Sequence, residues 1–123
     1  MVDIDSEIIK IAKEEFAMDS YSDLEIVCQD AYDFVREDTR KYELIIVDIF
    51  INNGVPEKFY DDTFWENIFR ILSSSGQIIF NTMIETTNTE LFHSIIARLE
   101  RNGFILSVYE RVRGTNMVVI ARR

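Results

Sequence analysis

Two short runs of apolar residues, Leu44–Val47 and Ile78–Phe80, constrain the fold of this chain more than any other feature of the sequence. Neither run contains a polar residue, and each ends abruptly at one, Asp48 after the first and Asn81 after the second. Strands that are apolar on both sides are typical of parallel sheets whose two faces are covered by helices. The runs therefore predict parallel strands, covered on both faces, in an α/β fold.

The segments around these runs show the spacing of apolar residues that is typical of helices. Apolar residues recur at helical spacing in four places, at residues 8–16, 31–35, 64–72 and 91–99. Asp5 and Ser6 suit the start of the first helix, and Thr87 with Glu90 forms a capping box ahead of the last. Further strand-like runs precede the first two helices, at Met1–Ile4 and Leu24–Cys28. Such a repeated order of strand and helix predicts a layered α/β architecture.

The C-terminal end breaks this alternation. Two strand-like runs, Phe104–Val112 and Asn116–Ala121, are separated by only three residues. Because so short a link cannot hold a crossover helix, the two strands should form an antiparallel hairpin. The whole pattern predicts a three-layer α/β fold whose sheet is mostly parallel and ends in an antiparallel pair.

The composition fits one globular domain over residues 1–123, because 47% of the residues are hydrophobic. The net charge of −9 is uneven, since residues 1–62 hold 6 basic and 17 acidic residues, a net −11. Nucleic-acid binding depends on Lys and Arg that displace counterions, so this balance argues against a nucleic-acid partner. The sequence shows neither a signal peptide nor the roughly 18 apolar residues of a membrane span, and we expect a cytoplasmic protein.

Residues that commonly hold metals or phosphates are scarce. With one histidine, His93, and one cysteine, Cys28, the chain offers no ligand cluster, so we expect no metal site. Cys28 lies inside an apolar run and should be buried. The chain also lacks a glycine-rich phosphate loop, because no two of its glycines are close together: Gly54, Gly76, Gly103 and Gly114.

Three acidic residues stand at or just after the ends of predicted strands: Asp3, Asp30 and Asp48. In open α/β sheets, ligands bind in the crevice beyond the carboxyl ends of the strands, and an acid there can bond ribose hydroxyls. Asn81 occupies a similar position. Because burying unpaired carboxylates is costly, three of them on one rim indicate a shared polar ligand. The alternative is that each carboxylate simply caps the helix that follows it.

Five blocks follow one another along the chain: Val2-Asp3-Ile4-Asp5, Gln29-Asp30-Ala31 with Asp33-Phe34, residues 42–48, Gly54-Val55-Pro56-Glu57 and residues 72–81. In this order they resemble spermidine synthase-like proteins of the class I S-adenosylmethionine-dependent methyltransferase superfamily. The resemblance covers nearly the whole chain. It implies a Rossmann-like methyltransferase fold, S-adenosylmethionine or a related sulfonium nucleoside as cofactor, and alkyl transfer to a small-molecule acceptor.

The resemblance also implies roles for individual residues. The acid that matches Asp3 holds the ribose hydroxyls in that family. The acid that matches Asp30 contacts the adenine amino group, with the backbone of Ala31 beside it. The acid that matches Asp48 lies at the reaction centre, near the sulfonium and the nucleophile. The resemblance thus implies that Asp48 is catalytic and that the other three residues bind the cofactor.

Two departures from the family bear on function. Family members begin with a strand and a glycine-rich loop, whereas Met1 matches the start of their second strand, so we expect an N-terminally truncated domain. Polyamine-forming members carry another acid where this chain has Ile51, which cannot pair with an ammonium group. Aminopropyl transfer is therefore disfavoured, and a non-catalytic fragment that serves as an interaction module is the alternative. A nicotinamide-binding domain would need the same glycine loop.

The absent first strand would leave a gap in the middle of the sheet, because the superfamily places it between the second and fourth strands. Exposed strand edges pair readily with other chains. We therefore expect the gap to be closed in one of two ways. Either the Met1–Ile4 region pairs directly with Leu44–Val47, or a second chain fills the gap, as in a homo-oligomer.

Overall fold

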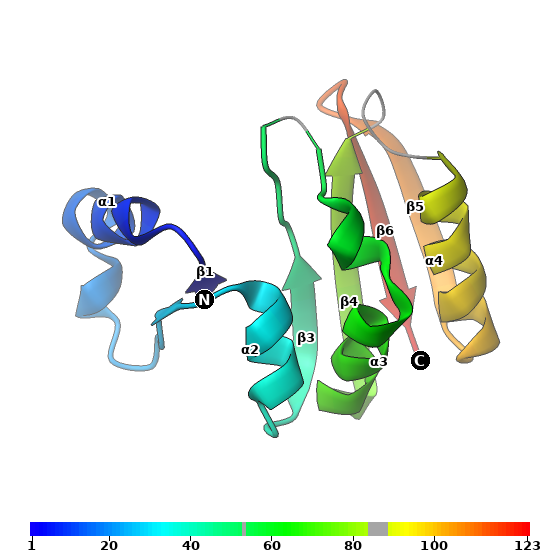
Figure 1. Ribbon diagram of the computed structural model, residues 1–123, viewed down its shortest axis with the longest axis horizontal. Coiled ribbons are helices and arrows are strands. Elements are labelled where there is room, and N and C mark those ends of the chain that lie inside the picture. Colours follow the sequence, from blue (N-terminus) through cyan, green and yellow to red (C-terminus); the bar gives the residue numbers. More distant parts are fainter. Residues whose placement is uncertain (53, 84–88) are drawn as a thin grey trace. The chain divides into compact units, whose positions relative to one another are not determined.

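The structure, a computed structural model, describes residues 1–52, 54–83 and 89–123 and divides the chain into two compact units. The N-terminal unit is Met1–Asp38 and the C-terminal unit is Thr39–Arg123. Thr87 of the expected capping box lies outside the described residues. In chain order the elements (Figure 1) are β1 (Val2–Asp3), α1 (Ser6–Phe16), η1 (Met18–Ser20), β2 (Val27–Cys28), α2 (Ala31–Glu37), β3 (Tyr42–Val47), η2 (Glu57–Tyr60), α3 (Asp62–Ile71), β4 (Leu72–Met83), α4 (Thr89–Arg101), β5 (Ile105–Val112) and β6 (Asn116–Arg122).

The N-terminal unit is built on a short parallel pair of strands. β1 pairs with β2 so that Val2 lies opposite Val27 and Asp3 lies opposite Cys28. The expected first helix is confirmed as α1, and Asp5 caps it by accepting hydrogen bonds from the Glu7 and Ile8 amides. β2 is shorter than the apolar run Leu24–Cys28 that predicted it. Cys28 is exposed, so the prediction that its thiol is buried is wrong.

The C-terminal unit holds a four-stranded mixed sheet in the order β3-β4-β6-β5. β3 pairs with β4 in parallel, which confirms the parallel orientation predicted for the two apolar runs. β4 pairs antiparallel with β6 and β6 with β5, which confirms the C-terminal hairpin. β4 is longer than expected, because the strand already begins at Leu72, directly after α3 ends at Ile71.

Helices α3 and α4 cover one face of this sheet (Figure 1). The core beneath them centres on Trp65, which is fully buried and whose ring packs edge-on against Phe80 of β4 at 5.4 Å between centroids. The Trp65 indole N–H donates to the Phe59 carbonyl at 2.9 Å, so its polar atom is satisfied inside the core. The buried side chains of the sheet that face these helices include Val47, Ile78, Phe80, Val119 and Ala121.

The opposite side of the sheet is open in the C-terminal unit. Side chains alternate along a strand, so the neighbours of the buried residues point the other way. Leu44 and Ile46 of β3 are 49% and 59% exposed. Within the C-terminal unit, α3 and α4 pack on the same side, so this unit covers only one of the two faces that the sequence predicts to be covered. We call the side that carries Leu44 and Ile46 the open face.

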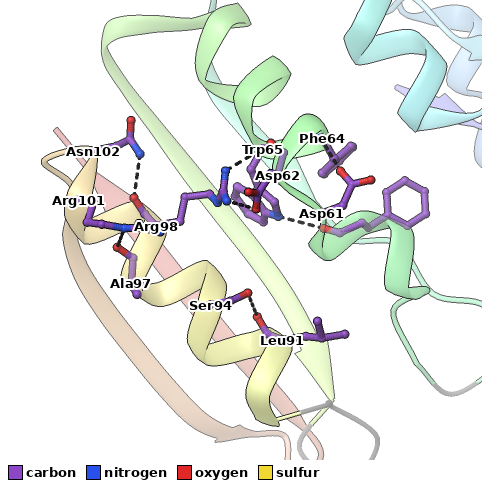
Figure 2. A network of polar contacts seen from close by, with 11 residues as sticks. Asp61, Asp62, Phe64, Trp65, Leu91, Ser94, Ala97, Arg98, Arg101 and Asn102 are labelled. Carbon is purple, nitrogen blue, oxygen red and sulfur yellow. Dashed lines mark hydrogen bonds and ion pairs between the residues drawn. The ribbon is translucent and has the colours of Figure 1, made fainter.

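Arg98 of α4 contacts Asp62 of α3 (Figure 2). Arg98 of α4 forms an ion pair with the carboxylate of Asp62 and also donates to the Asp62 carbonyl at 3.4 Å. The Arg98 side chain is only 14% exposed, whereas that of Asp62 is 77% exposed. α4, with 13 residues, is the longest described helix, and none of the described helices has the length and apolar character required to cross a bilayer.

β3 forms one edge of the four-stranded sheet. Within the described residues it pairs with β4 alone, while Val2–Asp3 pairs with Val27–Cys28 in a separate two-stranded sheet. The expected direct pairing of Met1–Ile4 with Leu44–Val47 would join the two units, and it stays a prediction. Among the described residues of the C-terminal unit, the outer edge of β3 has no neighbouring strand, and such an edge is a template for another strand.

Candidate functional site

A chain of polar side chains crosses the end of the C-terminal sheet. Asn81 of β4 donates its side-chain amide to the Asp48 carboxylate, with 2.9 Å between Nδ2 and Oδ1. Asn116, the first residue of β6, donates in turn to the Asn81 side-chain oxygen at 3.0 Å. Three strands therefore fix the position of one carboxylate.

The register of the strands explains why these residues meet. Val47 lies opposite Phe80 in the parallel pair, so Asp48, the first residue after β3, lies beside Asn81, the next residue of β4. Asn81 lies opposite Val118, close to the start of β6 where Asn116 stands. Asp48 itself is exposed, and in the described part of the chain only Asn81 contacts its carboxylate. Asp48 can accordingly accept a hydrogen bond or a proton from a bound group.

A small hollow adjoins this polar chain. Its volume is about 160 Å³, and its lining consists of Asn81, Val112, Arg113, Asn116 and Val118. Asn81 and Asn116 thus belong both to the hollow and to the chain that ends on Asp48. Sequence reasoning identified Asp48 and Asn81 but missed Asn116. The sequence feature that could have indicated Asn116 is its position directly after the tight turn at Gly114. At that point β6 begins beside β4.

Asp3 occupies the carboxyl end of β1 in the N-terminal unit. Its carboxylate accepts one hydrogen bond, from the Asp5 amide to Oδ1 at 2.9 Å. The residue is half-buried, and no other described group contacts that carboxylate. The second oxygen of Asp3 is therefore available to a ligand. Asp3 does not cap a helix, because Asp5 caps α1.

Asp30 and Ala31 follow β2, the neighbour of β1. Because the two strands are parallel, their carboxyl ends lie at the same edge of the pair, as the sequence predicts. Asp30 caps α2 by accepting a hydrogen bond from the Tyr32 amide at 2.9 Å, and Ala31 is the first residue of that helix. The alternative that each acid caps the helix that follows it is therefore confirmed for Asp30. It does not hold for Asp48, because α3, the next α-helix after Asp48, is capped by Asp61.

Comparison with protein families gives one match that spans most of the chain. The model of the spermine/spermidine synthase domain matches residues 1–112. Among curated relatives, the polyamine aminopropyltransferase of Sulfolobus acidocaldarius is 29% identical over 107 residues, which are 81% of this chain and 35% of that protein. The chain thus spans about a third of the length of that relative.

Solved structures resemble the whole chain. Human methyltransferase-like protein 13, in complex with SAH, superposes with a TM-score of 0.78 at 22% identity, over 98% of this chain and 59% of that one. A spermidine synthase in complex with the transition-state analogue AdoDATO gives a TM-score of 0.74 at 16% identity, over 98% of this chain and 45% of that one. These likenesses show the fold, which is the α/β Rossmann-like methyltransferase fold expected from the sequence.

Proposed function

The chain belongs to the spermine/spermidine synthase domain family, and on that premise we propose that it binds a sulfonium nucleoside of the S-adenosylmethionine type and transfers an alkyl group to a small-molecule acceptor. The family match and the likeness to proteins solved with SAH and AdoDATO support this proposal. The observation that carries it is local. Asp3 and Asp30 stand at the same edge of two paired parallel strands, and the Asp3 carboxylate keeps an oxygen for a ligand.

In this proposal, Asp3, Asp30 and Ala31 hold the nucleoside. The free oxygen of Asp3 accepts a hydrogen bond from a ribose hydroxyl, which fits a half-buried carboxylate at a strand end. Asp30 accepts from the adenine amino group while Oδ1 remains bonded to the Tyr32 amide. A carboxylate has lone pairs for both bonds. The residues present therefore fit a nucleoside.

Asp48 acts on the acceptor in this proposal. The sulfonium, when bound, supplies an electrophilic carbon that needs little acid–base help, so the protein mainly has to align the nucleophile. The Asp48 carboxylate, held at one oxygen by Asn81, would orient the nucleophile and accept its proton. Asn81 and Asn116 are positioning residues, since they act through Asp48.

The acceptor is a small molecule other than a polyamine in this proposal. Ile51, three residues after Asp48, is 59% exposed and presents an apolar side chain. An ammonium group gains nothing from such a neighbour, because an alkyl side chain offers no acceptor. Aminopropyl transfer to an amine, which the names of the curated relatives describe, is therefore the less favoured activity here.

A second candidate is an interaction module without catalysis. The open face favours it, because Leu44 and Ile46 are largely exposed and large exposed apolar surfaces mark contact sites. The two candidates differ in what they predict for nucleosides. An enzyme of this class needs a nucleoside site, whereas an interaction module does not.

Isothermal titration calorimetry tests the proposal. We expect methylthioadenosine to bind saturably to the full chain, and methylthioinosine, which lacks the exocyclic amino group, to bind more weakly. Equal binding of the two nucleosides would overturn the role of Asp30. The absence of binding by methylthioadenosine and by S-adenosylmethionine would overturn the proposed function and favour the interaction module.

A further inference from the structure

The turn between β5 and β6 lies at the same end of the sheet as the carboxyl ends of β3 and β4 (Figure 1). It carries Arg113, which lines the hollow together with Asn81 and Asn116. Arg113 is exposed, and no carboxylate in the described part of the chain pairs with its guanidinium group. A guanidinium offers five N–H donors and no acceptor. The lining of the hollow thus includes a cation that is available to a ligand.

The backbone of this turn holds Arg113 in an unfavourable conformation. The φ angle of Arg113 is 50° and that of Arg111 is 56°, both in the left-handed region that residues with a side chain disfavour. The hairpin also contains a bulge, because β5 advances three residues over Tyr109–Val112 while β6 advances two over Asn116–Val118. Bulges redirect side chains and are common beside active sites. Two arginines in a turn where glycine fits more easily indicate that an arginine side chain has a function there.

The two asparagines of the hollow add further N–H donors. The Thr115 hydroxyl donates to Asn116 Oδ1 at 2.9 Å, and Asn116 Nδ2 donates to Asn81 Oδ1 at 3.0 Å. Both side-chain oxygens therefore already accept a hydrogen bond. Each Nδ2 carries two hydrogens and uses one of them, Asn116 toward Asn81 and Asn81 toward Asp48. The hollow accordingly favours a ligand group that accepts hydrogen bonds and is negatively charged.

The size and the place of the hollow limit the ligand. Its volume of about 160 Å³ suits a small group, and Val112 and Val118 give it apolar walls. β4 lies between β3 and β6, so Asp48 and the start of β6 are two strand spacings apart, about 10 Å. A short carbon chain with a polar group at each end fits this arrangement. The planar fork of an arginine matches a carboxylate, which it binds through two parallel hydrogen bonds.

We propose that the hollow binds a carboxylate group, held by Arg113 and Asn116, and we call it the carboxylate site. The inference rests on the proposed function, in which the bound molecule is the acceptor and its nucleophile lies at Asp48. The acceptor is then a short-chain carboxylic acid with a nucleophile at its other end. A diamine fits less well, because Arg113 repels its second ammonium group. This reason against a polyamine acceptor is independent of Ile51.

Nuclear magnetic resonance of the nitrogen-labelled full chain tests the carboxylate site. We expect γ-aminobutyrate to shift the side-chain amide signals of Asn81 and Asn116 saturably. Butylamine, which has the same amine and carbon chain but no carboxylate, should bind at least about tenfold more weakly.

Variants of the turn identify the group that binds the carboxylate. We expect Arg113→Gln to weaken the binding of γ-aminobutyrate about tenfold. Arg113→Lys should recover part of the loss, because lysine keeps the charge but not the fork. Arg111→Gln is the matched control and should bind like the wild type, since it removes the same charge from the same turn but Arg111 does not line the hollow. Circular dichroism shows whether each variant is folded.

Equal binding of the two probes, or an equal loss in Arg113→Gln and Arg111→Gln, would overturn the carboxylate site, as would an absence of saturable shifts. The titration contains no nucleoside, so its result does not depend on Asp3 or Asp30. If γ-aminobutyrate binds through Arg113 while methylthioadenosine does not bind, the carboxylate site stands and the proposed function fails. If methylthioadenosine binds and γ-aminobutyrate does not, only the carboxylate site fails.

Discussion

The side-chain amide of Asn81 donates to the Asp48 carboxylate at 2.9 Å, from the strand next to the one that Asp48 follows. Asn116 holds the amide of Asn81 in that orientation by donating to its oxygen at 3.0 Å. Because the two Asn side chains and the carboxylate form one chain of donors and acceptors, the orientation of each depends on the next. Among the described residues, the Asp48 carboxylate is thus held by side chains of the sheet.

The bond between Asp48 and Asn81 can be measured by a double-mutant cycle. We expect Asp48→Ala and Asn81→Ala to be coupled by about 1 kcal/mol in the free energy of unfolding, the usual net value of one hydrogen bond. Urea titration of the wild type, both single variants and the double variant gives the coupling. Asp48→Ala combined with Asn102→Ala, on α4, should be additive within about 0.5 kcal/mol. A coupling no larger than in this control would contradict the bond.

Ile51 provides a test of acceptor class. We expect the wild type to bind putrescine only weakly in the presence of methylthioadenosine, and Ile51→Asp to bind it with an affinity at least about tenfold higher. The added carboxylate can pair with an ammonium group, and Ile51 is exposed, so its replacement costs little packing. Ile51→Asn is the neutral control of similar shape. Calorimetry that shows the same gain for the Asn variant would refute the role of charge.

Gly76 of β4 has no room for a side chain. A Cβ atom there would lie 2.7 Å from the Leu72 side chain and 3.1 Å from the Ser73 carbonyl oxygen. Leu72 is buried at 2% exposure and cannot move aside freely. We expect Gly76→Ala to lower the free energy of unfolding by about 1 to 3 kcal/mol, while Ser75→Ala, at the exposed neighbouring position, should change it by less than about 0.5 kcal/mol. Equal stability of the two variants in urea would refute the close approach.

The ion pair between Arg98 and Asp62 has unequal partners, because the arginine is mostly buried and the aspartate is mostly exposed. Asp62→Ala leaves a largely buried cation with one weak main-chain bond, so we expect it to cost about 1 to 2 kcal/mol. Arg98→Met should cost less, because the apolar stem is kept and Asp62 remains in water. Urea is the suitable denaturant, since guanidinium chloride screens the pair. The reverse order of the two costs would contradict this assignment.

Much of the fold could be predicted because the local signals were strong. The runs that became β3 and β4 contain only apolar residues, and Asp5 is a good cap ahead of α1. The burial of β3 was not predictable in the same way. An apolar strand indicates that other elements cover it, but the strand's own residues do not indicate which elements these are. In the C-terminal unit, α3 and α4 pack on the same face of the sheet.

The residues of the candidate site that come directly after an apolar run could be predicted from the sequence. Asp48 and Asn81 end neighbouring apolar runs, so their proximity follows from a parallel register. Asn116 was missed because it begins its strand, and only the antiparallel pairing of β6 with β4 brings a strand start to that edge. Cys28 was predicted to be buried from its apolar neighbours, yet β2 has only two residues and leaves it exposed.

The most direct test of the proposed function is the affinity of methylthioadenosine for Asp3→Ala, measured by calorimetry. Hydrogen bonds to a charged group contribute about 1.5 to 3 kcal/mol, so we predict a loss of about 10- to 100-fold. Asp3→Asn should also weaken binding while keeping an acceptor for the Asp5 amide. Asp19→Ala, at an exposed position in the same unit, should bind like the wild type. An unchanged affinity in Asp3→Ala, or no binding by the wild type, would contradict the account.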